Sequence, residues 1–157
     1  MQTAVRVAHS ACYRKGKNVM GLLSTMNVSG SALTAQRLRM DVIAGNIANA
    51  ETTRINGQRQ PFQRQQVVFQ PLSQGLGGAS EGLQVAAIVK DTSAGRQVYE
   101  PANPDADPAT GLVAYPNVDT TTEMTDMLSA SRAYQANVTV LDSIKQMAQR
   151  SIDLGKA

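Results

Sequence analysis

The sequence predicts a mainly α-helical fold with a small β-rich insert: paired N- and C-terminal helices form a coiled-coil-like unit, with short strands and loops between them. Two observations predict this fold. Near both ends of the 157-residue chain, apolar residues recur every seven positions, which is the spacing of a coiled-coil seam. The middle of the chain is instead rich in Gln, Gly and Pro, which is typical of short strands joined by turns.

Composition divides the chain into four regions. Residues 1–19 form a basic extension that we expect to be disordered or absent from the native protein, and residues 20–53 form an N-terminal helical region. Residues 54–119 form a small β-rich central domain with loops, and residues 120–157 form a C-terminal helix. The chain has six aromatic residues and no Trp. Its core must therefore consist mainly of aliphatic residues and Met, which favours helix packing.

The N-terminal helical region has its apolar residues at heptad spacing. One series recurs every seven residues and a companion series fills the positions between: Met26, Leu33, Met40 and Ile47, with Leu22, Ile43 and Ala50. Ser31 follows Ser29 and Gly30 at a position suited to a helix cap, which predicts a break there. Gly45 lies inside the pattern and predicts a close backbone approach.

The C-terminal region repeats this spacing over a longer stretch. Two series are predicted, with Ile144 and Ile152 nearby: Met127, Tyr134, Leu141 and Ala148, and then Met124, Ser131 and Val138. Thr120, Thr121 or Thr122 is expected to cap the helix, and Glu123 to place negative charge at its start. Gly155 is expected to end it.

The central region has three β-rich runs, at residues 66–69, 84–89 and 96–100. Two groups of turn-forming residues are expected to form loops: Gly75, Gly77, Gly78 and Gly82 in the first, and Asn103, Pro104, Asp105, Asp107 and Pro108 in the second. The glycines do not form a phosphate-binding loop, because no Lys-Ser/Thr pair follows them. The second group has the oxygen spacing of a calcium loop, but Pro108 and Ala114 replace its Gly and Glu.

Charge and cysteine content argue against several classes of function. The net charge of +3 comes from residues 1–19, which contain four of the 15 basic residues and none of the 12 acidic ones. The rest of the chain therefore has no basic excess for binding nucleic acid. Cys12 is the single cysteine, and with His9 it supplies two metal ligands at most. The single histidine also excludes a Ser-His-Asp triad built on the central region.

No catalytic, cofactor-binding or metal residues are therefore predicted, and the protein is not expected to be an enzyme. No apolar run has the length of a membrane helix, so direct membrane insertion is not expected. The apolar stretch from residue 3 to residue 11 is broken by Arg6, His9 and Ser10, which argues against a cleaved Sec signal.

The outer faces of both helical regions have few charges and many Ala, Ser, Thr, Asn and Gln residues. Such faces lack the ion-pair cover of a solvated helix and suit burial against neighbouring subunits. The residues expected at an assembly interface are Leu33, Met40, Ile43, Ile47, Asn46, Asn49, Met127, Tyr134, Asn137, Val138 and Leu141.

Several segments resemble flagellar rod and hook proteins. The N-terminal signature is carried by residues 27–36 (NVSGSALTAQ) and 46–53 (NIANAETT), and the C-terminal one by 115–119 (YPNVD), Glu123 with Met124, 133–137 (AYQAN) and 154–156 (LGK). The resemblance extends over residues 20–156. The short length and the YPNVD segment favour the FlgC type of the flagella basal body rod protein family. Residues 1–19 lie outside the pattern.

The resemblance implies a structural subunit of the proximal rod that is exported by the type III apparatus and lies in the part of the basal body that crosses the periplasm. It implies helical polymerisation with itself and with FlgB, FlgF, FlgG and FliE-like rod proteins, to form a drive shaft that transmits torque for motility. The terminal helices would line the inner tube. Two other classes remain: a non-flagellar coiled-coil adaptor or regulator, which would not polymerise, and a small hydrolase, which would need a polar pocket.

Overall fold

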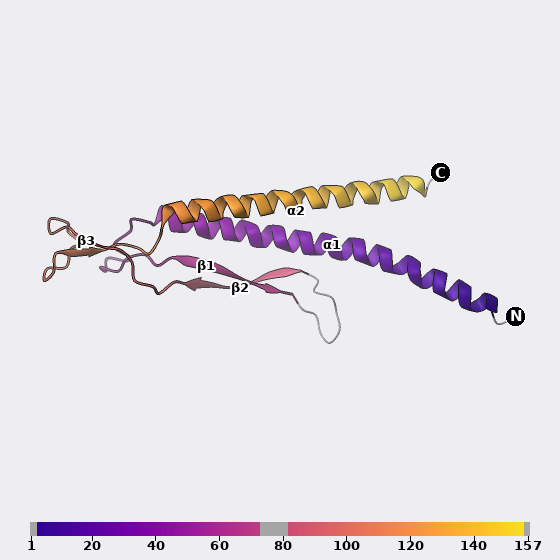
Figure 1. Cartoon of the computed structure of the whole chain (residues 1–157), viewed down its shortest axis with the longest axis horizontal. Coiled ribbons are helices and arrows are strands. Elements are labelled where there is room, and N and C mark those ends of the chain that lie inside the picture. Colours follow the sequence, from indigo (N-terminus) through magenta and orange to yellow (C-terminus); the bar gives the residue numbers. More distant parts are fainter. Residues whose placement is uncertain (1–2, 73–81, 156–157) are drawn as a thin grey trace.

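The computed structural model describes residues 3–72 and 82–155, with side chains described from residue 24 onward. Along the chain, two long helices precede and follow a strand-containing middle. The order is α1 (Thr3–Ala48), β1 (Gln65–Pro71), β2 (Leu83–Lys90), β3 (Gln97–Tyr99), β4 (Leu112–Ala114) and α2 (Thr120–Leu154). Figure 1 shows an elongated molecule in which α1 lies between α2 and the β1–β2 hairpin. The helices lie side by side near the end of α1 and diverge toward the two termini. The predicted helical ends and strand-containing middle are confirmed.

Helix α1 is continuous through residues 29–31, so the predicted break at Ser31 is wrong. The Ser31 hydroxyl donates to the Val28 carbonyl within the helix (2.8 Å) and accepts the Leu83 amide of the hairpin (2.9 Å). It therefore links the helix to β2 and does not cap a helix. The helix also includes residues 3–19. At Gly45 no atom outside its own helical turn lies within 4 Å of an added Cβ, so the close approach predicted there is not found among the described residues.

The β1–β2 hairpin lies against α1 through alternate residues. The strands pair antiparallel from Gln65↔Lys90 to Pro71↔Leu83, with an irregularity between Val68 and Phe69. Residues Val67 and Phe69 are partly buried and Val68 is exposed, as expected of a strand with one face against a helix. Two of the predicted β-rich runs are therefore confirmed as β1 and β2.

A second, smaller sheet lies beyond the ends of the helices (Figure 1). Its strands β3 and β4 pair antiparallel from Gln97↔Ala114 to Tyr99↔Leu112. The third β-rich run is confirmed as β3, but β4 was not predicted. Of the predicted loops, the one from Asn103 to Pro108 consists of turns, and Gly75, Gly77 and Gly78 lie outside the described residues.

The core of the described chain is small. Its buried hydrophobic residues are Ala35, Ile43, Val113, Ala130 and Ile144, and most come from the facing sides of the two helices. No described helix is long and apolar enough to cross a membrane.

Helix α2 is capped by Asp119 rather than by one of the three threonines predicted to cap it. The Asp119 carboxylate accepts from the Thr121 amide (3.1 Å) and from the Thr122 hydroxyl (2.7 Å). These hydrogen bonds, that from the Thr122 side chain first, hold the pKa of Asp119 below its ordinary value. The helix ends at Leu154, before Gly155, as predicted.

The cap predicts an acid-dependent loss of stability. Because the pKa of Asp119 is lowered by folding, its ionised form stabilises the folded state above the unfolded pKa of about 3.9, and this contribution is lost as the pH falls through the folded pKa. Asp119→Asn keeps a capping oxygen but cannot titrate. The difference in Tm between the wild type and this variant should therefore shrink between pH 7 and pH 3. Asp142→Asn, in the middle of α2, is the control, and an equal change for both variants would contradict the prediction.

Candidate assembly surface and polar junction

The seam of α2 combines two series of residues at seven-residue spacing. The predicted series of Met127, Tyr134, Leu141 and Ala148 is partly buried along its whole length. The second buried series begins at Glu123 and continues through Ala130, Asn137 and Ile144. The second series predicted from sequence is wrong at Met124, which is 62% exposed, and at Val138, which is 36% exposed, whereas Ser131 is partly buried.

The seam of α1 follows the predicted pattern more closely. Leu33, Met40 and Ile47 are partly buried, and Ile43 is buried. Met26 is exposed, unlike the other three members of its series. The side chain of Leu22 lies outside the described part of the chain.

Two of the predicted interface residues lie inside the chain. Ile43 is buried in the core, and Asn46 is 1% exposed. Asn49 is partly exposed, and its amide group bonds the Gly45 carbonyl of its own helix (2.8 Å). The contacts of Ile43 and Asn46 in the single chain are therefore internal, and the interface expected at these two residues stays a prediction.

Asn46 belongs to a buried polar junction at the end of α1, which we define as Asn46, Arg64 and Glu123. The Asn46 carboxamide pairs with the backbone of Gln65 in both directions, accepting from its amide (2.9 Å) and donating to its carbonyl (2.8 Å). It also donates to Glu123 Oε2 (3.0 Å). A helix side chain thus occupies the place of a neighbouring strand at the start of β1.

Glu123 is the acidic member of the junction and is 1% exposed. Its Oε1 accepts from Arg64 Nε at 2.5 Å. Arg64 also pairs with Asp126 (3.4 Å), which in turn pairs with Arg39 of α1 (3.6 Å). Glu123 places its charge in the first turn of α2, as predicted, and its carboxylate also makes a buried ion pair and accepts an amide hydrogen bond. Both carboxylate oxygens have partners, as a buried charge requires.

The start of β1 is also fixed from the opposite side. Asn117 accepts the Arg64 amide (2.9 Å), and its carboxamide donates to the Ser93 hydroxyl (3.0 Å). The segment entering α2 therefore holds the backbone of Arg64 while Glu123 holds its side chain.

The acidic residues of the loop that has the oxygen spacing of a calcium loop form hydrogen bonds and an ion pair with other side chains of the protein. Asp105 accepts from the Thr53 hydroxyl (2.6 Å) and pairs with Arg54 (2.7 Å), while Asp107 accepts from Thr110 (3.1 Å). Within the described ranges, no three His, Cys, Asp or Glu side chains are grouped so as to hold a metal ion. The side chains of His9 and Cys12 lie outside those ranges.

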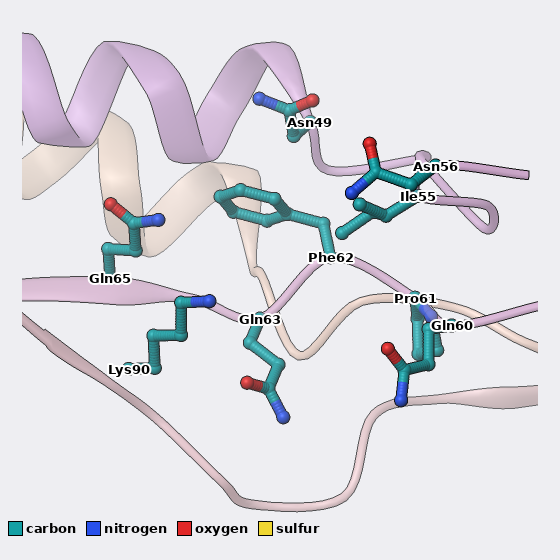
Figure 2. A pocket seen from close by; sticks show the side chains of 9 residues that line it. All are labelled: Asn49, Ile55, Asn56, Gln60, Pro61, Phe62, Gln63, Gln65 and Lys90. Atoms are coloured by element: carbon teal, nitrogen blue, oxygen red, sulfur yellow. The ribbon is translucent and has the colours of Figure 1, made fainter. Parts of the chain in front are cut away.

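A hollow of about 590 Å³ lies beside the end of α1, and five of its nine lining residues have carboxamide side chains. Figure 2 shows the ring of Phe62 beneath the end of α1, on the side of Asn49. The other lining residues are Ile55, Asn56, Gln60, Pro61, Gln63, Gln65 and Lys90. Carboxamides donate and accept hydrogen bonds but do not exchange protons near neutral pH. The lining therefore suits contact with a polar surface better than acid–base chemistry.

Comparisons with known proteins agree at both ends of the chain. Residues 26–54 match the family described as flagella basal body rod protein, and residues 109–154 match the one described as flagellar basal body rod FlgEFG protein C-terminal. A relative from Bacillus subtilis, named flagellar basal-body rod protein FlgC, is 41% identical, and the match covers 87% of this chain and 100% of the relative.

Two further relatives carry the same name. One from Escherichia coli O6:H1 is 44% identical, with 87% of this chain and 100% of the relative covered. One from Borreliella burgdorferi is 42% identical, with 85% and 97% covered. These identities extend over most of the chain, and the two helical regions match in the expected order. The chain therefore belongs to the family of flagellar basal-body rod proteins of the FlgC type.

Proposed function

We propose that this chain is a structural subunit of the flagellar basal-body rod, and that it polymerises through its paired terminal helices, which act as a coiled-coil-like unit. Family membership supports the place in the rod. The surface of the chain supports polymerisation.

The observation that carries the proposal is the amount of exposed surface. The chain has an accessible surface of 11652 Å² for a mass of 16.7 kDa. A compact monomer of that mass exposes about 7,600 Å². The excess of roughly 4,000 Å² is of the size that obligate subunit interfaces bury. A chain with so small a core therefore has a large further surface to bury against neighbours.

The exposed apolar residues of α2 indicate where neighbours bind. Met124 and Leu128, at 62% and 53% exposed, lie one helical turn apart, outside the seam with α1. Met147, Ile152 and Leu154 are exposed farther along the same helix. The proposed assembly surface therefore adds these residues to the partly exposed members of the predicted set: Leu33, Met40, Ile47, Asn49, Met127, Tyr134, Asn137, Val138 and Leu141.

The finer features of the proposal follow from the resemblance of the chain to its family. The subunit is exported by the type III apparatus without a cleaved Sec signal and joins the part of the rod that crosses the periplasm. Its neighbours are copies of itself and FlgB, FlgF, FlgG and FliE-like subunits. Torque passes through side-chain packing between subunits, with no cofactor.

The proposal is tested by a substitution that introduces a charge on the exposed face of α2. Leu128→Asp should leave the unfolding free energy of the isolated chain within about 0.5 kcal/mol of wild type, because the side chain is exposed. In the rod, however, it would bury an unpaired carboxylate. Cells lacking the native gene and expressing this variant should form no rods by electron microscopy and should not swim, whereas cells expressing Ser129→Asp, one residue away and also exposed, should do both.

Normal rods with Leu128→Asp would show that this face of α2 stays in solvent. A chain that stays monodisperse at all concentrations in sedimentation, and has no effect on rods when deleted, would favour the coiled-coil adaptor.

A further inference from the structure

The apolar seam between α1 and α2 does not by itself specify how far one helix is shifted along the other. Both helices repeat every seven residues, and seven residues correspond to about 10 Å along the axis. A shift by one repeat would again place small or aliphatic side chains such as Leu33, Met40 and Leu141 against one another. Packing energy therefore discriminates weakly between the alternatives.

The polar junction differs from the seam because it occurs once. Asn46 and Arg64 converge on the two oxygens of Glu123, at 3.0 Å and 2.5 Å. If α2 moved by one repeat, Ala130 or Pro116 would take the position of Glu123. Neither side chain accepts a hydrogen bond, so Asn46 and Arg64 would lose their shared partner at a buried site.

Asn46, one of the two partners of Glu123, is held independently of α2. Asn46 is paired with the backbone of Gln65 in both directions. Arg64 directly precedes Gln65, so the guanidinium and the carboxamide are presented together by β1 and α1. The acceptor that they share comes from one position on α2, Glu123, while Arg64 also pairs with Asp126 of the same helix.

We propose that the Asn46–Arg64–Glu123 junction is a register device, which fixes the position of α2 along α1 and along the hairpin. Buried polar groups destabilise a core relative to apolar ones, and fixing register is their best-attested use. The junction thereby determines which residues of α1 and α2 lie at the same level on the subunit surface. This last consequence rests on the proposed function, because a rod subunit must present one surface to its neighbours.

The test separates register from stability. The variant Asn46→Leu/Arg64→Met/Glu123→Leu replaces the junction by apolar side chains in the full chain. Spin labels at Ala44→Cys and Ser129→Cys, both exposed positions, in a Cys12→Ser background report the distance between the helices by pulsed electron paramagnetic resonance. The parent should give one distance. The variant should keep its helix content and a Tm at or above that of the parent, but show a second distance population, because a shift of about 10 Å along the axis per repeat changes the separation of the two labels.

The matched control is Arg54→Met/Asp105→Leu, which removes an ion pair of 2.7 Å outside the seam and should leave one distance. A single unchanged distance in the triple variant would overturn the proposal. If the triple variant does not fold, Arg64→Met/Glu123→Leu, with Asn46 still on Gln65, is judged by the same criterion. Failure of both to fold would also overturn it, because the junction would then be required for stability. The distances are measured on the isolated chain, so they are independent of the Leu128→Asp result.

Discussion

Arg64→Ala is expected to lower the free energy of unfolding by about 3–5 kcal/mol, because it leaves a buried carboxylate without its cation. Glu123 is 1% exposed and Arg64 Nε lies 2.5 Å from it. Asn46 would remain as a neutral donor, which does not offset the charge. Urea unfolding followed by far-UV circular dichroism measures the change.

The control for this prediction is Arg54→Ala, which removes a more exposed partner of Asp105. Exposed ion pairs contribute about 0–1 kcal/mol, so its effect should be several times smaller. Arg64→Lys keeps the charge but loses the planar donor set that serves Glu123 and Asp126 together, and should give an intermediate loss. Equal losses for Arg64→Ala and Arg54→Ala would mean that Glu123 does not depend on Arg64.

The helices could be predicted from sequence because their periodicity extends over many turns. Strands β1 and β2 could be predicted because each contains a run of Val, Ile or Phe. The three-residue strand β4 has no such run, and only its partner β3 and the burial of Val113 define it. A strand of that length is specified by tertiary contacts.

The second series of α2 could not be chosen correctly from apolar content. Met124 and Val138 are more apolar than Glu123, Ala130 and Asn137, yet the latter three face α1. Small side chains allow the two helices to approach closely. A polar side chain is tolerated between them when it has a hydrogen-bond or ion-pair partner. The more apolar residues of α2 thus lie on the face that points away from α1. This arrangement is expected of a subunit that buries its outer face in an assembly.

The polar junction could not be predicted from sequence because its members are far apart. Asn46 and Glu123 are separated by 77 positions. Each residue also had a sufficient local explanation, Glu123 as a charge at a helix start and Asn46 as part of the family signature. The signal that remained was a Glu in the first turn with no basic residue nearby on its own helix.

Leu141→Asp is expected to abolish rod assembly. Leu141 is a partly buried member of the α2 seam and, in the proposed pairing, faces the series of Leu33, Met40 and Ile47. Replacing a buried Leu by Ala costs about 2–5 kcal/mol, and the exposed part of Leu141 places Leu141→Ala toward the lower end. An aspartate at the same position adds the cost of burying an unpaired charge and should be more destabilising.

The loss of assembly must be separated from a loss of export. The amount of variant protein secreted is therefore measured alongside rod formation and swimming, and export should persist because it does not require a packed seam. Gln135→Ala is the control, because Gln135 is exposed in the chain and its replacement changes little apolar burial. If cells export the Leu141→Asp protein and build working flagella, the seam between the terminal helices is not required in the rod. Secreted protein without rods would show that the packing of α2 is the step at which assembly fails.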